Sequence, residues 1–521
     1  MPGFRELFAR KTVAQAQAEA ADPLVLAEPR LKRSLGVWQL TALGIGAIVG
    51  AGIFSGAGSA VAGGPNHPGA GPALVISYLL VAVACGFAAL CYAEFASLIP
   101  QAGSAYTYAY ATLGELIAWI IGWDLIIEYA VGNIAVAVSW SAYFQTLLRG
   151  FGLGFPEWLA TDLRTAYDGF RAWRDAGGHL AALDPAKRAA AVAWLDAPRL
   201  FGLPIIFNLP AVLVVALITW ILVLGIRESA WANTAMVILK LAILLFFILI
   251  GAFWVRPEYW TPFAPNGWQG ILRGAAIIFF AYIGFDAVST AAEEAKNPQR
   301  DMPRAMIASL VVTTVLYVVV TLVMTGLVPW YQHATADPLA SAFVARGYDW
   351  AAGVIAFGAV IAMASVLLVF QLGQPRIFFA MARDGLLPPW AAKVHPRYRT
   401  PVVTTVITGV FVAFFSAFAN INEVIELTNI GTLFAFVLVA IGVLVLRVLE
   451  PDRPRPFRTP AVWFVAPAAV LSCGFLMVNL PRITWIRFGV WLAAGLVLYF
   501  VYGYRHSRLR RRVSELSLQE G

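Results

Sequence analysis

Charged residues are scarce in this sequence of 521 residues. Asp, Glu, Lys and Arg make up 13% of it, about half the share of roughly 25% found in soluble domains. The longest stretch without any of them runs from residue 34 to residue 93. Further uncharged stretches, each about long enough to cross a hydrocarbon core as a helix, cover residues 200–226, 305–336, 350–375, 400–422, 427–446 and 459–481. The sequence therefore predicts an all-α polytopic membrane protein and excludes a soluble enzyme.

Cysteine and histidine are too few to build a metal or disulfide site. The three cysteines, Cys85, Cys91 and Cys473, lie in apolar stretches without a CxxC pattern, and the five histidines fall in loops or the tail. Disulfide frameworks and zinc sites need such residues at short, regular spacing. We therefore expect no metal, no cofactor and no enzymatic activity.

The hydrophobic segments divide into twelve candidate spans, whose ends are placed at Gly, Pro and charge clusters. They begin near Leu35, Pro72, Leu113, Leu203, Ser229, Gln269, Arg304, Asp349, Pro401, Glu423, Pro460 and Thr484. An even number of spans places both termini on one side, and 24 of the 37 Lys and Arg residues fall on that side. Because basic residues concentrate in cytoplasmic loops, we predict a multi-pass protein of the cell membrane with both termini cytoplasmic. The net charge of +8 then reflects orientation in a lipid bilayer, and no nucleic-acid partner is expected.

Two of the spans contain residues that interrupt a helix. The sixth span places Gly284 and Asp286 inside an apolar run. The first span carries glycines at Gly44, Gly46, Gly50, Gly52, Gly56 and Gly58. Irregular backbone at membrane depth persists only where it is buried or lines a cavity. Close helix packing through Gly46 and Gly50 is the alternative explanation for the first span taken alone.

Interrupted helices at corresponding positions indicate an inverted repeat. The first and sixth spans start about 234 residues apart, the second and seventh about 232, and the third and eighth about 236. The predicted parts are an arm at 1–34, a first five-helix repeat at 35–254, a second at 269–449, helices eleven and twelve at 460–505, and a tail at 506–521. Half-helix ends meeting at the midplane would offer amide groups to an anion and carbonyl groups to a cation. A zwitterion fits such a site.

Lys240 lies about a dozen residues from either end of the fifth span. A lysine at the centre of a span costs roughly 2.5–3.5 kcal/mol on insertion scales, so it must be paired with oxygen atoms or be neutral for part of its cycle. It is either a proton-coupling group or a structural pin. Asp124 and Glu128, four residues apart on one face of the third span, either partner Lys240 or form a hydrated cluster near the membrane surface.

One long loop, residues 150–202, has a pattern of its own. Pro156 could open a helix that closes at Gly177 and Gly178, and Asp184 with Pro185 resembles a second helix start. We predict a small extracytoplasmic helical cap. Because its basic and acidic residues nearly cancel, it is either a neutral spacer or a lid that selects ligands.

Three stretches carry a resemblance to a known family. They are residues 43–54, read LGIGAIVGAGIF; residues 283–303, read IGFDAVSTAAEEAKNPQRDMP; and residues 380–388, read AMARDGLLP. With these three motifs in this order and at these positions, the sequence resembles the amino acid-polyamine-organocation superfamily. Within that superfamily it resembles the cationic amino acid transporters and their bacterial relatives. The resemblance covers nearly all twelve spans and implies a LeuT-type fold, a 5+5 inverted repeat followed by two helices.

The resemblance also implies roles for individual residues. The backbone amide groups that would hold a substrate carboxylate are those of Gly50, Ala51 and Gly52. The backbone carbonyl groups that would hold its ammonium are those of Ile48, Phe280, Ala281 and Ile283. Lys240 matches the fifth-span lysine of proton-coupled members, and Ser365 is its candidate partner, with Glu128 a second candidate proton-coupling residue.

The resemblance, together with these residues, predicts a proton-coupled symporter that imports L-amino acids by alternating access. Small or neutral amino acids are favoured because no acidic residue lies among residues 353–374 to meet a basic side chain. An exchanger, or a cationic amino acid or polyamine transporter on the same fold, is the alternative, and a membrane amino acid sensor is a more remote one. The sequence leaves open whether a small membrane-protein partner or a dimer exists.

Overall fold

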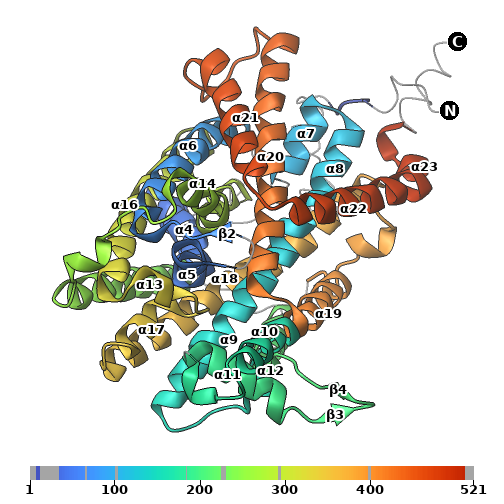
Figure 1. Ribbon diagram of the computed structural model, residues 1–521. Helices are drawn as coiled ribbons and strands as arrows, with labels where there is room; N and C mark the ends of the chain where they lie inside the picture. Colours follow the sequence, from blue (N-terminus) through green and yellow to red (C-terminus); the bar gives the residue numbers. More distant parts are fainter. Residues whose placement is uncertain are drawn as a thin grey trace, which may run out of the picture.

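The structure of the protein, a computed structural model, is a bundle of helices (Figure 1). It describes residues 8–11, 35–64, 67–99, 104–183, 185–224, 230–290, 295–396 and 400–510. The predicted amino-terminal arm, apart from residues 8–11, and the tail after residue 510 lie outside these ranges.

Eight helical segments in the described ranges are long and apolar enough to cross a bilayer. They are α4 (Val37–Ile48) with η1 (Gly52–Gly56) and α5 (Ala57–Ala62); η2 (Gly71–Ala73) with α6 (Leu74–Leu98); α8 (Glu115–Ile126) with η3 (Ile127–Val131) and α9 (Gly132–Gly150); α13 (Ala230–Ala252); α16 (Pro298–Leu327); α18 (Asp349–Arg383); α20 (Ile421–Leu449); and α22 (Arg482–Leu498) with η11 (Tyr499–Gly503) and α23 (Tyr504–His506). Three shorter apolar helices are α12 (Leu209–Val223), α19 (Val402–Phe418) and α21 (Val462–Val478). These segments confirm a helical, multi-pass membrane protein.

Shorter elements connect these helices. The helical ones are α7 (Ser104–Thr112), η6 (Pro257–Trp260), α14 (Gly267–Ile278), η7 (Phe279–Tyr282), α15 (Ala287–Thr290), η9 (Trp330–His333), α17 (Pro338–Val344) and η10 (Pro389–Ala392). Two antiparallel hairpins pair β1 (Gly63–Gly64) with β2 (His67–Pro68) and β3 (Arg199–Leu200) with β4 (Leu203–Pro204). All three cysteines are buried and free.

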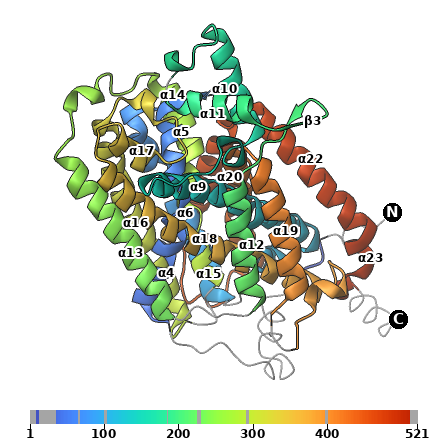
Figure 2. The same ribbon diagram turned by 90° about the horizontal axis from the view of Figure 1, so that it is seen from below.

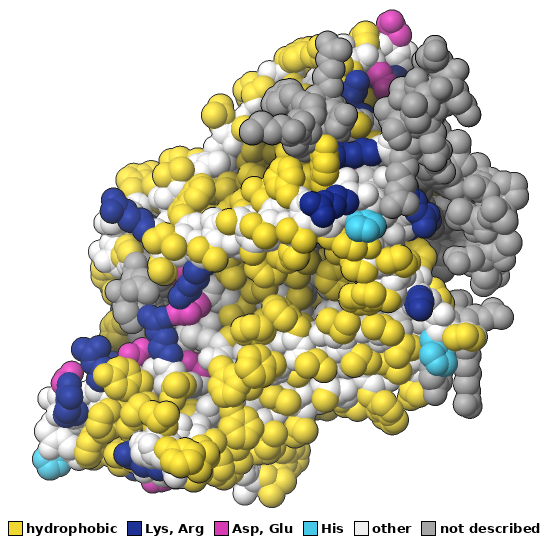
Figure 3. All heavy atoms as spheres, turned by 90° about the vertical axis from the view of Figure 1, so that its right-hand side faces the viewer, with side chains coloured by type: hydrophobic (Ala, Val, Ile, Leu, Met, Phe, Trp, Pro, Cys, Tyr) yellow, Lys and Arg dark blue, Asp and Glu magenta, His cyan; other side chains and the backbone are white. Residues whose placement is uncertain are grey.

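Large apolar side chains cover the outside of the bundle. Trp220, Leu249, Phe414 and Trp463, from four different helices, expose between 59% and 67% of their surface. On the face in Figure 3 the hydrophobic side chains form a broad surface, and charged side chains lie mostly toward its left and upper edges. A soluble monomer rarely exposes apolar patches of this extent, whereas lipid tails solvate them.

The fourth apolar helix begins later than the sequence predicts. Its start was expected near Leu203, but that residue pairs with Leu200 in the β3–β4 hairpin. Helix α12 begins at Leu209, where the Asn208 side chain accepts a hydrogen bond from the Ala211 amide at 3.2 Å. The apolar run continues through the hairpin, so the helix-capping residue, rather than hydrophobicity, marks the boundary.

Residues 150–202 form a small helical layer, which we call the cap. Helices α10 (Leu163–Asp175) and α11 (Pro185–Asp196) pack against each other, with short turns η4 (Glu157–Leu159) and η5 (Leu180–Ala182) beside them. Helix α10 starts at Leu163 rather than at Pro156 because Asp162 caps it, accepting from the Thr165 amide at 3.0 Å. Gly169 permits close packing, since a Cβ there would lie 2.5 Å from the Cβ of Ala190. Figure 2 shows α10, α11 and β3 together at one end of the bundle.

Packing between the long helices places the interrupted segments inside the bundle. Helix α16 runs against α6 and α4, and α18 packs against α9 and α13. Helix α4 also contacts α13 and α18, while α14 packs against α6 and α5. Protein therefore surrounds both irregular segments, as irregular backbone at membrane depth requires.

The buried carboxylate of Glu94 forms hydrogen bonds and ion pairs with three parts of the chain at one end of the bundle. Glu94 on α6 accepts hydrogen bonds from Arg447 on α20 at 3.0 and 2.7 Å. It also forms an ion pair with Arg455 at 3.1 Å and accepts from the Thr459 amide at 2.8 Å. The Glu94 and Arg455 side chains are each 1% exposed. This cluster joins α6 to α20 and to the segment before α21.

Replacing this carboxylate should destabilise the protein strongly. We expect Glu94→Ala to lower the free energy of unfolding by about 3–5 kcal/mol, because two guanidinium groups lose their buried partner. The matched control is Glu157→Ala, which removes an exposed ion pair to Arg149 and should cost about 0–1 kcal/mol. Thermal unfolding of the purified protein in detergent measures both, and equal midpoints for the two variants would contradict the assignment.

Candidate functional site

The first interruption separates α4 from α5. Helix α4 ends at Ile48, and Val49 is extended with φ −75° and ψ 96°. Helical backbone resumes at Ala51 and continues as the π-helical turn η1. The last carbonyl groups of one half and the first amide groups of the other have no partners within their own helices. The predicted residues Ile48, Gly50, Ala51 and Gly52 all lie at this break, and all are buried.

The second interruption follows α14. The chain changes to the 3₁₀ turn η7 at Phe279, becomes extended at Ile283, and reaches a positive φ of 119° at Gly284. The Asp286 carboxylate accepts a hydrogen bond from the Gly284 amide at 3.1 Å. The predicted carbonyl residues Phe280, Ala281 and Ile283 lie on this turn and are buried.

The two interruptions touch each other. A Cβ at Gly52 would lie 2.2 Å from the Cα of Ala281, and a Cβ at Gly284 would lie 2.8 Å from the carbonyl of Ala47. A side chain at either glycine would force the two backbones apart. The structure thus brings together the two groups of residues that the sequence places more than 200 positions apart.

Tyr317 on α16 bridges the two interruptions. Its hydroxyl lies 2.9 Å from the carbonyl oxygen of Ile48 and 3.0 Å from that of Ala281. Both carbonyls belong to the set predicted to hold an ammonium group, and here they face the same point. The Tyr317 ring packs against Tyr78 and Tyr282, with ring centroids 5.3 and 5.6 Å away.

Two other side chains reach carbonyl groups near the breaks. Lys240 on α13 is fully buried and donates to the carbonyl oxygen of Gly46 at 2.6 Å. In a continuous helix that oxygen would accept from residue 50, but α4 ends two residues after Gly46. Asn429 on α20 donates to the carbonyl oxygens of Ala276 and Ile277, both at 2.8 Å, at the end of α14. Lysine and asparagine here supply donors where the helices stop.

The remaining predicted residues lie on neighbouring helices. Ser365 is buried on α18, next to Val366, whose side chain would lie 3.0 Å from a Cβ at Gly50. Glu128 is buried in the π-helical turn η3 and lies within hydrogen-bonding reach of the Asp286 and Thr432 side chains. Of the two third-span carboxylates, Glu128 faces the carboxyl group of Asp286, and a role for either of them as a partner of Lys240 stays a prediction.

Toward the cap, the first interruption is covered by a layer of hydrogen-bonded side chains. Tyr143 donates to the carbonyl oxygen of Phe54 at 2.5 Å, and the two rings meet edge to face. Ser55 donates to the carbonyl oxygen of Ala336 at 2.5 Å. The next residue, Asp337, accepts hydrogen bonds from Thr146 and Ser341. These contacts connect the segment after the first interruption to α9 and to the loop before α17.

Burial shifts the pKa of Asp337 in that layer and of His333 at the end of η9, four residues before it. Burial lowers the pKa of His333 to about 4, so its ring is neutral at physiological pH. Burial also raises the pKa of Asp337, against the lowering effect of its hydrogen bonds from Thr146 and Ser341. Both shifts favour the uncharged form of the group.

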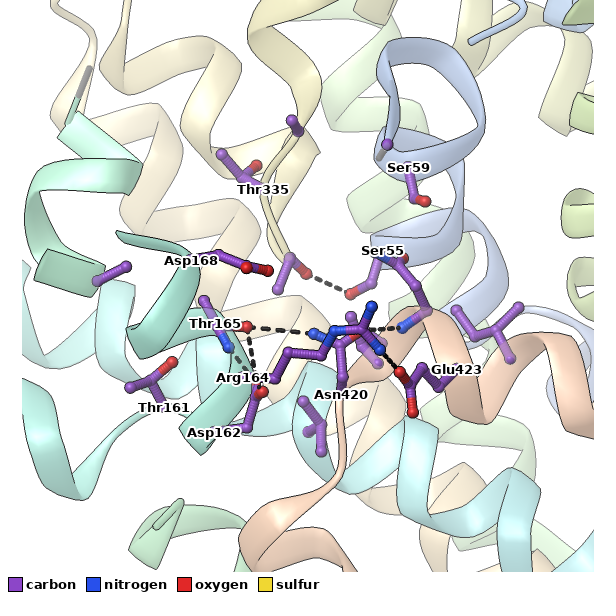
Figure 4. A pocket seen from close by; sticks show the side chains of 18 of the residues that line it. Ser55, Ser59, Thr161, Asp162, Arg164, Thr165, Asp168, Thr335, Asn420 and Glu423 are labelled. Carbon is purple, nitrogen blue, oxygen red and sulfur yellow. Dashed lines mark hydrogen bonds and ion pairs between the residues drawn. The ribbon is translucent and has the colours of Figure 1, made fainter. Parts of the chain in front are cut away.

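A pocket of about 850 Å³ opens between the cap and this layer (Figure 4). Its walls come from α10, from the starts of α20 and α22, and from Ser55 and the loop at 334–336. We call it the cap pocket. None of the residues predicted from the sequence lines it.

Several of these residues are not among those predicted from the sequence. Tyr317 and Asn429 carry hydrogen-bonding groups inside apolar spans, which is itself a functional signal at membrane depth. Tyr143 and Ser55 likewise lie in long helical segments, and for all four residues the sequence does not identify the partners, which are backbone carbonyls distant along the chain. Within the described part of the chain no group of three or more His, Cys, Asp or Glu residues could hold a metal ion.

A polytopic helical protein with two broken helices meeting in its interior belongs to the class of membrane transporters. Residues 35–500 match the amino acid permease family. The chain therefore belongs to this family, within the amino acid-polyamine-organocation superfamily, and is a transporter rather than an enzyme.

Three of the relatives come from a bacterium and a plant. The branched-chain amino acid permease BcaP of Bacillus subtilis is 46% identical over 93% of this chain and 96% of its own length. The methylthioribose transporter of the same organism is 43% identical, over 92% and 95%. The vacuolar cationic amino acid transporter 2 of Arabidopsis thaliana is 36% identical, over 87% of this chain and 65% of its own length.

The Tyr317 bridge leads to a stability prediction. We expect Tyr317→Phe to lower the free energy of unfolding by about 1–3 kcal/mol, because two buried carbonyl groups lose a shared donor. The control is Tyr331→Phe, since Tyr331 is 60% exposed and should tolerate loss of its hydroxyl. Thermal unfolding in detergent distinguishes them, and an unchanged midpoint for Tyr317→Phe would show that the hydroxyl is not a required donor.

Proposed function

We propose that the protein is a proton-coupled symporter that imports small or neutral L-amino acids. The observation that carries this proposal is the meeting of the two interruptions, where Tyr317 faces the carbonyls of Ile48 and Ala281 at 2.9 and 3.0 Å. Hydrogen-bond donors and hydrogen-bond acceptors are thereby available close together in the protein interior. A free amino acid presents an ammonium and a carboxylate on adjacent atoms, so it matches that arrangement.

The backbone at the two interruptions binds the carboxylate and ammonium groups that all amino acid substrates share. The amide groups of Gly50, Ala51 and Gly52 open the second half of the first span, at the positive end of a helix dipole, and hold the carboxylate. The carbonyl groups at the negative ends hold the ammonium. They belong to Ile48, Phe280, Ala281 and Ile283.

The twelve spans arise from the eight long segments, the three shorter apolar helices and the interrupted segment α14–η7–α15. The first five and the next five spans form an inverted repeat, at 35–254 and 269–449, with two further helices at 460–505. Both termini lie in the cytoplasm of a cell whose plasma membrane holds the protein. The cap then faces outward.

Lys240 couples proton movement to transport. Its ammonium group donates to the Gly46 carbonyl at 2.6 Å, so its charge acts directly on the backbone beside the first interruption. Loss of its proton weakens that bond and frees α4 to move relative to α13. Ser365, on the neighbouring α18, and Glu128, which faces Asp286, are the two further proton-coupling residues in this proposal.

Access alternates by rocking of one group of helices against the rest. The moving group comprises α4–α5, α6, α14–α15 and α16. Mutual packing of α16 with α4 and α6, and of α14 with α6 and α5, supports their movement as one body. No covalent chemistry is involved.

The coupling role of Lys240 can be measured in proteoliposomes. One proton crossing 100 mV releases roughly 2.3 kcal/mol, enough for about fifty-fold accumulation of a zwitterion. We expect Lys240→Ala to reduce accumulation of L-leucine driven by an imposed proton gradient to about the external concentration. The control Lys393→Ala changes an exposed lysine and should accumulate normally. Full accumulation by Lys240→Ala would exclude this role.

Substrate preference is tested by thermal-shift screening of the twenty amino acids. The relative named as a branched-chain amino acid permease is 46% identical, and α18 has no acidic residue between Asp349 and its end at Arg383. We therefore expect stabilisation by leucine, valine, isoleucine or alanine and little effect of arginine or lysine. Stabilisation by arginine alone would favour a cationic amino acid transporter. Counterflow without net proton-driven uptake would favour an exchanger.

A further inference from the structure

The third apolar span carries a buried carboxyl group to which the proposed function gives no role. Asp124 on α8 is 1% exposed. Neither of its carboxyl oxygens has a hydrogen-bond partner in the described part of the chain. Helix α8 packs against α20, where a Cβ at Gly431 would lie 2.8 Å from Oδ1 of Asp124. The absence of a side chain at Gly431 therefore leaves the space that this carboxyl group occupies.

The surroundings of Asp124 favour its protonated form. An ionised carboxylate at this position would lose its hydration and gain no hydrogen-bond donor from the described residues in return. The protonated form has no net charge to stabilise, and its hydroxyl is itself a hydrogen-bond donor. Ionisable residues inside the hydrocarbon core commonly belong to proton or ion pathways. Asp124 therefore holds a proton in this conformation, and the remaining question is where that proton goes.

Asp124 lies one helical turn from Glu128, which is already part of the proposed coupling. Side chains four residues apart on a helix are neighbours, with roughly 5–6 Å between their Cβ atoms, and the two carboxyl groups interact electrostatically. Glu128 in turn faces Asp286 of the second interruption, and Thr432 of α20. In the opposite direction α8 begins at Glu115, at the cytoplasmic end of the span in the proposed orientation. The carboxyl groups therefore form a series that leads from the second interruption toward the cytoplasm.

The other ionisable groups that face this series are three phenol hydroxyls and a thiol. They belong to Cys85 and Tyr92 on α6, Tyr108 on α7 and Tyr129 on η3. Arg376 of α18 interacts electrostatically with Tyr129. Phenols and thiols keep their protons at neutral pH, so proton exchange within this group is confined to the carboxyl groups.

We propose that Asp124 is a proton-relay residue, which exchanges a proton with Glu128 on the cytoplasmic side of the second interruption. In each transfer an O–H bond breaks at one carboxyl group while an O–H bond forms at the other, so one proton moves and nothing is oxidised or reduced. This inference rests on the proposed function, because it takes proton coupling as given. It places the cytoplasmic part of the proton path along α8, apart from the backbone groups that hold the substrate.

Comparison of net uptake with counterflow in proteoliposomes separates a relay from a structural role. We expect Asp124→Asn to slow L-leucine uptake driven by an imposed proton gradient by at least about ten-fold, and to slow the accompanying proton entry, followed with trapped pyranine, equally. Counterflow of leucine at equal pH should match that of the unmodified protein, because exchange of loaded carriers requires no release of the proton. Asparagine has nearly the shape of protonated aspartic acid, so a purely structural role predicts no change in either rate.

Asp175→Asn is the matched control, because Asp175 is exposed on the cap, and it should change neither rate. Glu128→Gln should show the same loss of net uptake as Asp124→Asn. The double variant should be no slower than the slower single variant, since residues of one relay act in series and their effects are not additive. Asp124→Ser, which also lacks a carboxyl group, serves as the test variant if the asparagine variant does not fold.

The outcomes distinguish failure of the relay from failure of the proposed function. Unchanged net uptake by Asp124→Asn would overturn the relay and leave the proposed function standing. Loss of counterflow together with net uptake in a folded Asp124→Asn variant would also overturn the relay, because it would show a role in substrate transport itself. Counterflow without proton-driven accumulation by the unmodified protein would overturn the proton coupling on which the relay depends. Thermal unfolding in detergent confirms that each variant is folded.

Discussion

Breaking a helix inside the bilayer leaves backbone amide and carbonyl groups without their helical hydrogen bonds, where water cannot replace them. The rest of this structure depends on satisfying those groups in another way. The oxygens of Gly46 and Ile48 lose their helical donors where α4 ends, and Lys240 and Tyr317 supply new ones. Asn429 does the same for Ala276 and Ile277. These donors come from α13, α16 and α20. Movement of the broken segments relative to α13 and α20 must therefore exchange the hydrogen bonds donated by Lys240 and Asn429.

Local sequence predicted where the backbone breaks but not what stabilises it. The glycines around Gly50 and Gly284 mark both interruptions, because only glycine tolerates the close approach at Gly52 and the positive φ at Gly284. The long uncharged runs likewise gave the membrane class, and the three motifs gave the family. Tyr317 and Asn429 were missed, since their partners lie at least 36 positions away along the chain. The roles of the predicted site residues stay predictions.

The cap shows why a charge count alone gives little information about a loop. Its basic and acidic residues nearly cancel, which favoured a neutral spacer. Folding places Arg164 beside Glu423 and Arg487, while Asp168 points into the space on the other side. The sum is unchanged, but only the tertiary structure determines which of these charged side chains meet at the pocket. The same limit applied to α12, whose start depends on the Asn208 side chain rather than on hydrophobicity.

The hydroxyl of Tyr317 has a single hydrogen but stands between two acceptors, at 2.9 and 3.0 Å. That hydrogen cannot give a full hydrogen bond to both the Ile48 and Ala281 oxygens at the same time. An ammonium group brings three hydrogens and could serve both, leaving the tyrosine to accept the third. An arriving amine would thus complete an undersupplied set of bonds, so the two broken segments would hold together more firmly when loaded than when empty.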